Sequence, residues 1–356
     1  MVTAGRRTLT TARLSSQRTG GDLTSPVEVV RWMLAMQAQD YSGAKWSIGI
    51  RCPTATDASV EQAIAAREIV RSWPMRGTLH FVASEDLSWM LRISSARQST
   101  WAAKRRADLG ISDNELARAG ELAVDRLAGG RLIRRDDLLA TFEADGIPTA
   151  AQRGYHLIWN LAHSGLIVHG PVDGTQATFA LLDEWVPRPR VLEGDEALGE
   201  FASRYFASHG PATERDFAWW ASITLTDARI GIAIAQPESI EIDGVMYFHI
   251  GDLAPARPAV HALPGFDEYL LGYQDRSAGL DVRWANRIVP GNNGVFLPTL
   301  VVDGQIVGTW KRTARTTSVV AEIEPFTTLT ARASTGFERA MRRYGRFLGR
   351  DVTVRA

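Results

Sequence analysis

The chain has 356 residues, of which 45% are hydrophobic, and its 40 Lys and Arg residues are balanced by 40 Asp and Glu. This length indicates two or three globular domains, and the zero net charge excludes the strongly basic composition of many nucleic-acid-binding proteins. The single cysteine, Cys52, excludes an intramolecular disulfide and a cysteine-based metal site.

The charges are unevenly distributed along the chain. Residues 1–110 hold 15 Lys and Arg against 9 Asp and Glu, a net charge of +6. Residues 111–324 hold 18 against 29, which gives −11, and residues 325–356 hold 7 against 2, which gives +5. If the two basic ends meet in space, they form one surface for an anionic ligand. Otherwise the chain has three solvated surfaces that differ in charge.

The first block of predicted elements starts with a helix that has Ser25 as its N-cap and a proline at its first position. A second helix is predicted to be capped by Asp57, and two strands follow on either side of 74–77. A further helix is predicted to be capped by Ser84.

The second block, 111–190, has predicted helices over 112–128, 134–147 and 149–164, and then a hairpin that turns at 173–174. Three helices followed by a two-stranded wing is typical of a winged helix, whose third helix commonly enters a groove of duplex DNA.

The third block repeats this plan and adds a C-terminal part. Its helices are predicted over 195–210, 213–223 and 224–236, and hairpins are predicted at the Asp-Gly pairs 243–244 and 303–304, followed by a strand over 318–326 and a last helix over 328–349. The prediction is an α+β, mostly helical protein of three tandem winged-helix domains, 1–110, 111–190 and 191–356, the third with a C-terminal sheet and a final helix.

Two glutamines, Gln37 and Gln39, follow the first predicted helix in "MQAQDYSGA". On a helix their side chains would point about 200° apart, whereas on an extended segment they share a face. Both can address one site only if the helix ends near Met36 and the chain then straightens, with Tyr-Ser-Gly as a helix breaker. The alternative is a helix C-terminus where the amides bind free carbonyls. Asp40 is either a charge near the same site or a cap for the turn that follows.

Other candidate residues allow more than one interpretation. His80, in "RGTLHFVA", is either a base or phosphate contact, or a hydrogen-bonded strand histidine. The acidic residues of "FDEYLLGYQDRSAGLD" are suited to a metal, to a general base, or to an Asp-Arg network that organises a loop. His156 and His163 lie seven residues apart, which does not fit the metal-binding spacing of four. The sequence has no phosphate-binding or nucleophile-elbow motif, so we predict neither a metal nor a cofactor.

Taken together, "MQAQDYSGAKWSIGIR", "RGTLHFVA", "LPGFDEYLLGYQDRSAGLD" and "NNGVFLPTLVVDGQIVGTWKRT" resemble the AlkZ/YcaQ family of winged-helix DNA glycosylases. The resemblance implies a C-shaped body of three winged helices that removes alkylated purines from DNA without a metal; some members unhook interstrand crosslinks. The family's catalytic motif falls on Gln37, Ala38 and Gln39. A hairpin that probes DNA near the lesion would correspond to residues 295–312.

The motif suits a restricted substrate. A purine alkylated at a ring nitrogen is cationic and leaves readily, so the enzyme needs mainly to position a water and to stabilise positive charge on the sugar. Full base flipping is then unnecessary for bulky or crosslinked adducts. The resemblance implies a monomeric, cytoplasmic, nucleoid-associated enzyme of base excision repair or of self-resistance to a genotoxic natural product. Candidate DNA contacts, chosen by position, are Arg71, Arg76, His80, Arg153, Lys311 and Arg312.

Two other functions fit the sequence. A non-catalytic winged-helix regulator would read DNA with the helix at 149–164, although such proteins usually dimerise and the sequence has no dimerisation helix. A drug-sequestering protein would use tryptophans such as Trp32, Trp46 and Trp73.

Overall fold

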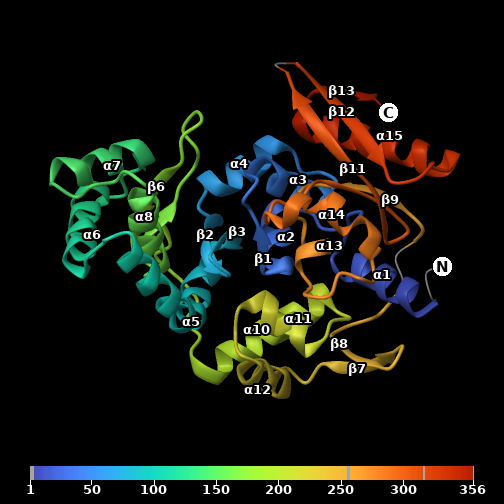
Figure 1. Ribbon diagram of the computed structural model, residues 1–356, viewed down its shortest axis with the longest axis horizontal. Coiled ribbons are helices and arrows are strands. Elements are labelled where there is room, and N and C mark those ends of the chain that lie inside the picture. Colours follow the sequence, from blue (N-terminus) through green and yellow to red (C-terminus); the bar gives the residue numbers. More distant parts are fainter. Residues whose placement is uncertain (1–3, 255–256, 316, 356) are drawn as a thin grey trace.

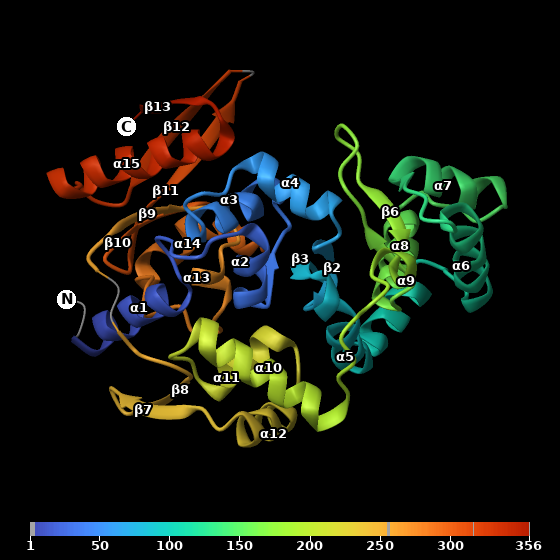
Figure 2. The ribbon, with the colours of Figure 1, turned by 180° about the vertical axis from the view of Figure 1, so that it is seen from behind.

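The computed structural model describes residues 4–254, 257–315 and 317–355, with the backbone alone for 95–101 and 314. The fold is α+β, and about half of the chain is helical, which is less than the mostly helical fold that the sequence predicts. Helices α6 (Asp113–Leu127) to α8 (Arg153–His163) lie at one end of the long axis, and α15 (Ala331–Leu348) with its sheet lies toward the other; residues 26–83 lie between them (Figures 1 and 2).

The first block carries the glutamine motif on short elements. They are α1 (Ala4–Ser16), α2 (Pro26–Met33), β1 (Ala35–Gln37), α3 (Tyr41–Arg51), α4 (Asp57–Ala65), β2 (Ile69–Met75), β3 (Thr78–Ala83), a 3-10 turn (Ser84–Asp86) and α5 (Leu87–Asp108). The side chain of Ser25 caps α2 by accepting from the N–H of Glu28, as predicted.

Two predicted caps are wrong. The cap of α4 is Thr56, whose hydroxyl accepts from the N–H of Ser59, and Asp57 is the first helical residue. Ser84 starts the 3-10 turn, while α5 begins at Leu87 after Asp86. At α4 the hydrogen bond from Ser59 decides that Thr56 is the cap, whereas Asp86 before α5 makes no capping hydrogen bond with its side chain.

The second and third blocks each place three helices before a hairpin. The second has α6 (Asp113–Leu127), β4 (Ile133–Arg134), α7 (Arg135–Ala144), α8 (Arg153–His163), β5 (Ile167–His169), β6 (Thr178–Leu181) and α9 (Leu182–Trp185). The third has α10 (Gly194–His209), α11 (Glu214–Ala221), α12 (Leu225–Ala235), β7 (Glu238–Ile242) and β8 (Val245–His249).

The C-terminal part builds a sheet with a helix against it. Its elements are β9 (Val260–Leu263), α13 (Glu268–Leu271), a 3-10 turn (Val282–Trp284), α14 (Ala285–Ile288), a 3-10 turn (Pro290–Asn292), β10 (Thr299–Val302), β11 (Gln305–Ala314), β12 (Ser318–Pro325), α15 (Ala331–Leu348) and β13 (Asp351–Arg355). The predicted turns at 243–244 and 303–304 are confirmed by the strand pairs on either side of them, and at both turns the Asp and the Gly adopt positive φ.

The described strands form three sheets, and one of them connects two blocks. The first has the order β1-β3-β2-β5-β6-β4, so the hairpins of the first two blocks join through a single pair, Arg71 with His169. The second has the order β13-β12-β11-β10-β9, and the third is the β7-β8 hairpin. Within the described part of the chain, no helix is both long and apolar enough to cross a bilayer.

The buried side chains form three hydrophobic clusters. One combines the N-terminal helices with the C-terminal sheet and α15, and it includes Trp46, Phe337 and Phe347. The second centres on α10 to α12, and the third lies within 73–181. Since a fully buried large apolar side chain contributes about 1.5–3 kcal/mol, the shared cluster fixes the glutamine motif against the C-terminal part.

Candidate active site

The backbone is extended up to Gln37, the first residue of the glutamine motif, and Gln39 then lies in a bend. Helix α2 ends at Met33, and Leu34 then takes φ 64° and turns the chain into β1. Gln37 is the register partner of His80 on β3. The predicted break is therefore confirmed, three residues earlier than Met36.

The two amides contact the same β2–β3 hairpin. The side-chain oxygen of Gln39 accepts from the N–H of Leu79 at 3.0 Å, and the N–H of Ala38 donates to the carbonyl of Leu79 at 2.7 Å. The side-chain oxygen of Gln37 lies 3.4 Å from Nη2 of Arg76. Gln37 is 8% exposed and Gln39 is exposed. A carbonyl oxygen has two lone pairs, so each amide oxygen keeps one acceptor position.

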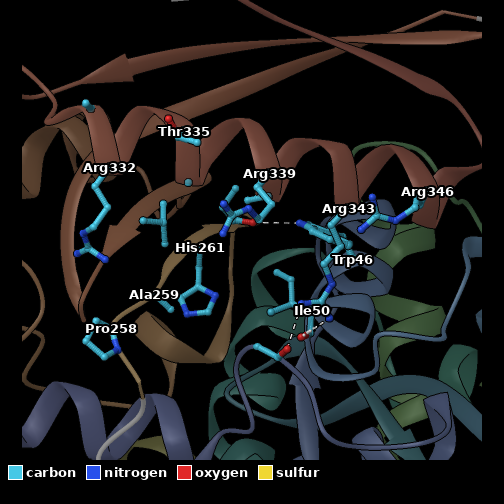
Figure 3. Close-up of a pocket in the computed structure, with 16 residues that line it drawn as sticks. Trp46, Ile50, Pro258, Ala259, His261, Arg332, Thr335, Arg339, Arg343 and Arg346 are labelled. Carbon is cyan, nitrogen blue, oxygen red and sulfur yellow. Dashed lines mark hydrogen bonds between the residues drawn. The ribbon is translucent and has the colours of Figure 1, made fainter.

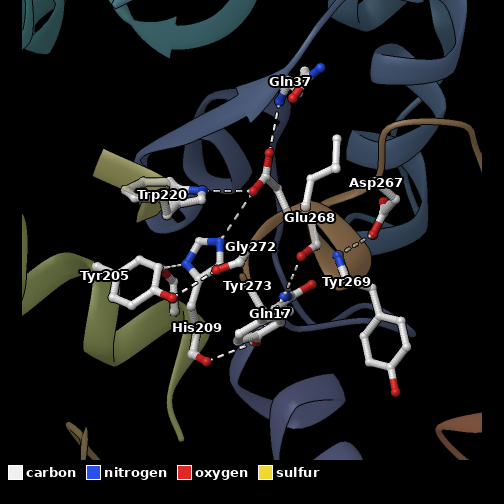
Figure 4. A network of polar contacts seen from close by, with 12 residues as sticks. Gln17, Gln37, Tyr205, His209, Trp220, Asp267, Glu268, Tyr269, Gly272 and Tyr273 are labelled. Carbon is white, nitrogen blue, oxygen red and sulfur yellow. Dashed lines mark hydrogen bonds and ion pairs between the residues drawn. The ribbon is translucent and has the colours of Figure 1, made fainter. Parts of the chain in front are cut away.

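A buried carboxylate, Glu268 of α13, lies behind the motif (Figure 4). Its Oε1 accepts from the backbone N–H of Gln37 at 2.9 Å, and its Oε2 accepts from Nε1 of Trp220 at 2.9 Å. Nε2 of His209 lies 3.5 Å from Oε2, which is a long contact. Burial opposes ionisation, but His209 and the positive charge of Arg76 outweigh it and lower the pKa of Glu268 to about 2. The motif therefore rests on a negative charge that is 1% exposed.

Arg76 supplies positive charge between the motif and this carboxylate. It donates to the carbonyl of Leu271 at 3.1 Å, and its guanidinium lies 4.7 Å from the ring centre of Trp219. Its Nη2 is 3.1 Å from Nε2 of His80. Because arginine only donates, Nε2 of His80 accepts, and Nδ1 donates to the carbonyl of Thr78 at 2.8 Å.

His80 is a hydrogen-bonded strand histidine, the second of the two interpretations. Burial, and then the charge of Arg76, lowers its pKa to about 3, so the imidazole is neutral near pH 7. The residue is 0% exposed. A DNA contact by His80 would require this side chain to become exposed, so that contact stays a prediction, and the structure shows His80 in hydrogen bonds within the hairpin.

Asp40 is a helix cap and an ion-pair partner at once. The Tyr-Ser-Gly segment does not break a helix but starts α3, and the carboxylate of Asp40 accepts from the N–H of Gly43 at 3.0 Å. Nη2 of Arg312 donates to both oxygens of Asp40, at 2.9 and 3.1 Å. This pair connects β11 to the residue that follows the motif.

Two other predicted DNA contacts, Arg71 and Lys311, have different surroundings. Arg71 donates to the carbonyl of Ala38 at 2.8 and 3.1 Å, so it holds the middle residue of the motif. The side chain of Lys311 is 76% exposed and pairs with Glu322, and it lines a hollow that Asp40 and Arg312 also line.

Arg153 lies apart from the motif, on α8 in the second block. Its guanidinium donates to Glu115 at 2.6 Å and to the carbonyls of Leu109, Gly110 and Pro148. These bonds hold α8 against its neighbours, so a phosphate contact by Arg153 would require them to break.

The sequence identified the acidic segment "FDEYLLGYQDRSAGLD" as a candidate site, but it did not identify the residues that this segment contacts. The segment's own Arg276 donates to the carbonyl of Leu270 and to no aspartate that the structure describes. Asp267 instead pairs with Arg51, far away in the chain, at 3.0 and 3.2 Å. No local pattern in the sequence indicated the roles of Glu268, His209 and Trp220. Among the described residues, no group of three or more His, Cys, Asp or Glu is arranged to hold a metal.

Comparisons with known proteins find a family model, a relative and a solved structure that match this chain. A family model of AlkZ-like DNA glycosylases matches residues 30–347. An interstrand DNA cross-link repair glycosylase of Streptomyces sahachiroi is 27% identical over 312 residues, which cover 81% of this chain and 82% of that relative. The solved structure of the Streptomyces sahachiroi DNA glycosylase AlkZ superposes with a TM-score of 0.80 at 22% identity and covers 100% of both chains.

Proposed function

Because the chain belongs to the AlkZ-like family of DNA glycosylases, we propose that it hydrolyses the N-glycosidic bond of alkylated, cationic purines in duplex DNA, with Gln37 and Gln39 as its catalytic residues. The observation that carries this proposal is the arrangement of the motif, whose two amide oxygens lie against one hairpin while an ionised carboxylate accepts from the backbone N–H of Gln37.

The amides orient a water and do not deprotonate it strongly, since an amide is a very weak base. Each glutamine oxygen has one lone pair engaged, by Arg76 or by the N–H of Leu79, which fixes its direction. Fixed dipoles of this kind stabilise charge in the transition state without reorganising. The charge of Glu268 favours positive charge on the sugar.

The electrostatics support a substrate whose base already carries a positive charge. His80 and His209 are both buried, and burial lowers the pKa of each, so neither is an acid that protonates a leaving base near pH 7. A neutral purine, which needs such protonation, is then a poor substrate. Selectivity comes from the leaving group more than from a tight pocket.

The relative's name, an interstrand DNA cross-link repair glycosylase, supports an extension of this activity to crosslinked or bulky adducts, in base excision repair or in self-resistance to a genotoxic natural product. We infer that each block, 1–110, 111–190 and 191–356, is a winged-helix domain of one C-shaped, monomeric, nucleoid-associated enzyme of the cytoplasm. The three helices before a hairpin in the second and third blocks support this organisation.

The test measures abasic sites in duplex DNA that contains 7-methylguanine. We expect the wild type to release the base and the double variant Gln37→Ala/Gln39→Ala to be slower by a factor on the order of 10² to 10³, the usual loss when a preorganised dipole is removed. Gln62→Ala, at an exposed glutamine of α4, is the matched control and should keep wild-type activity.

The same variants separate catalysis from binding. The double variant should keep its affinity for DNA, since its charge is unchanged. If the wild type released no base from simple or crosslinked alkylpurines but bound one DNA sequence selectively, the protein would be a winged-helix regulator and the enzymatic proposal would be wrong.

A further inference from the structure

A groove of about 700 Å³ runs between α15 on one side and α3 and β9 on the other (Figure 3). It joins the two basic ends of the chain, because Arg343 of α15 donates to the carbonyls of Gly20, Gly49 and Ile50. The charge distribution of the sequence allowed such a meeting, and the structure confirms that the two ends are in contact. The groove lies outside the glutamine motif, whose residues do not line it.

Four arginines of α15 line the groove, and none of the described lining residues is acidic. Arg332 forms an ion pair with Asp303. Arg343 donates to three backbone carbonyls, which have no net charge and so do not neutralise its positive charge. The guanidinium groups of Arg339 and Arg346 have no hydrogen-bond or ion-pair partner among the residues that the structure describes, and both residues are exposed. The groove therefore carries positive charge that the chain does not neutralise.

His261 of β9 adds a second sign of a ligand. It lines the groove below α15 (Figure 3), and it is only 9% exposed. Its Nε2 is buried and has no hydrogen-bond partner in the described part of the chain. An unpaired buried polar atom costs about 1–3 kcal/mol, and a ligand atom that pairs with Nε2 would remove this cost.

The shape of the groove favours a chain of phosphates over a single small anion. Arg339 and Arg346 are seven residues apart on one helix, which corresponds to about 10 Å along its axis. Planar guanidinium groups bind phosphate oxygens in pairs. Two such groups at this spacing fit two phosphates of one strand better than a single ion.

The groove and the glutamine motif lie beside different points along helix α3. Helix α3 begins beside the motif, at Tyr41, and its residues Trp46 and Ile50 line the groove. These residues lie about 8 to 14 Å along the helix axis from its start, which is less than one turn of duplex DNA, about 34 Å. We propose that the groove of α15 binds the phosphodiester backbone of the DNA substrate beside the lesion, an inference that rests on the proposed function.

The test compares two charge-matched double variants. Arg339→Gln/Arg346→Gln removes the unpaired groove arginines, and Arg342→Gln/Arg350→Gln removes two exposed arginines that do not line the groove. The affinity for a duplex with one 7-methylguanine is measured against salt concentration. We expect the groove variant to lower the slope of log K against log salt by about 2, because each phosphate contact contributes about 0.9. The control should change this slope by less than half as much.

The readouts also separate this inference from the proposed function. The groove variant should need a higher DNA concentration than the wild type to reach half of its maximal rate of base release, because the groove binds DNA and does not catalyse. A wild type that releases no base but shows the expected change in slope would refute the proposed function and leave the groove as a DNA-binding surface. Equal slopes for the groove variant and the wild type would overturn the inference.

A third experiment uses inorganic phosphate to distinguish DNA from a free phosphate ion as the ligand of the groove. In spectra of ¹⁵N-histidine-labelled protein, duplex DNA should shift the imidazole signal of His261 at micromolar concentrations, and inorganic phosphate should do so only at far higher concentrations. A shift with micromolar inorganic phosphate and none with DNA would mean that the groove takes a free phosphate, and the inference would be wrong.

Discussion

Glu268 holds a negative charge at the back of the glutamine motif, and this charge has two consequences at the scale of single residues. Its hydrogen bond from the N–H of Gln37 fixes the motif's backbone. Its charge also lies where the substrate sugar is expected to become positive. An ionised carboxylate with 1% exposure acts through a low dielectric, so its influence extends further than that of an exposed acid.

We predict that Glu268→Gln slows base release by roughly thirtyfold while the KM for damaged DNA stays within about twofold. A charge about 8 Å from the reacting sugar, at an effective dielectric constant of about 20, contributes about 2 kcal/mol to the transition state. Glutamine keeps the shape and an acceptor for Gln37 but removes the charge. Single-turnover kinetics on 7-methylguanine DNA give this comparison.

Asp267→Asn is the control for a merely structural effect. The buried pair of Asp267 with Arg51 stabilises the fold, and breaking such a pair costs about 3–5 kcal/mol. This variant should therefore lower the free energy of unfolding while its folded fraction keeps the wild-type rate. If both variants lost rate equally, Glu268 would not act through its charge.

At the scale of elements, the ion pair between Asp40 and Arg312 joins α3 to β11. The two side chains are 36% and 20% exposed, so solvent screens the pair only in part. Because Asp40 is also the cap of α3, its loss would combine two effects. Asparagine is as good a cap as aspartate, so Asp40→Asn removes the charge and leaves the cap.

A double-mutant cycle with Asp40→Asn and Arg312→Gln should give a coupling free energy of about 1 kcal/mol, within the range for contacting residues. Asp40→Ala should cost about 1 kcal/mol more than Asp40→Asn, because it also removes the cap. Urea denaturation measures both quantities. Additive single variants, with no coupling, would show that the pair does not hold the hairpin.

The sequence predicts best those elements whose conformation is determined by residues close together in the chain. The Asp-Gly pairs at 243–244 and 303–304 set their turns because both positions adopt positive φ. Helix α3 escaped prediction because it is buried over 43–51, so its sequence has no polar face to give a helical period. Strand β13 was not predicted, because it pairs in parallel with β12 and no tight turn between the two strands marks the pairing in the sequence.

The same distinction holds for the site. The end of the helix before Gln37 followed from two glutamines one residue apart, and this prediction needed only local geometry. Glu268 binds the N–H of a residue 231 positions away, so no local pattern identifies it as the partner. His80 is a polar residue in a predicted strand. Only the structure, in which it is buried and contacts Arg76, shows that its imidazole is neutral.

For the whole molecule, several buried histidines make stability depend on pH. Burial, and then nearby arginines, lowers the pKa of His80 and His169 to about 3 and that of His261 to about 4. An unfolded histidine has a pKa of about 6.5. Between these values the unfolded chain binds protons that the folded chain does not. Stability is therefore complete above about pH 6.5 and is lost as the pH falls toward 4.

We predict that the free energy of unfolding falls by about 6 kcal/mol between pH 7 and pH 5. Each of the three histidines loses about 2 kcal/mol over the 1.5 pH units below 6.5. Because a domain's total stability is typically about 5–15 kcal/mol, the protein should be close to unfolding at pH 5. Urea denaturation at pH 7, 6 and 5 measures this decline.

His169→Phe tests whether buried histidines cause the decline. The imidazole of His169 packs against Trp73 and Phe179, with ring centres 4.8 and 4.6 Å away, so a phenyl ring fits the same contacts. The variant loses one hydrogen bond to the carbonyl of Arg71, which lowers its stability at every pH by a similar amount. Its decline from pH 7 to pH 5 should be about 2 kcal/mol smaller than that of the wild type. An equal decline in both proteins would mean that groups other than this histidine take up the protons.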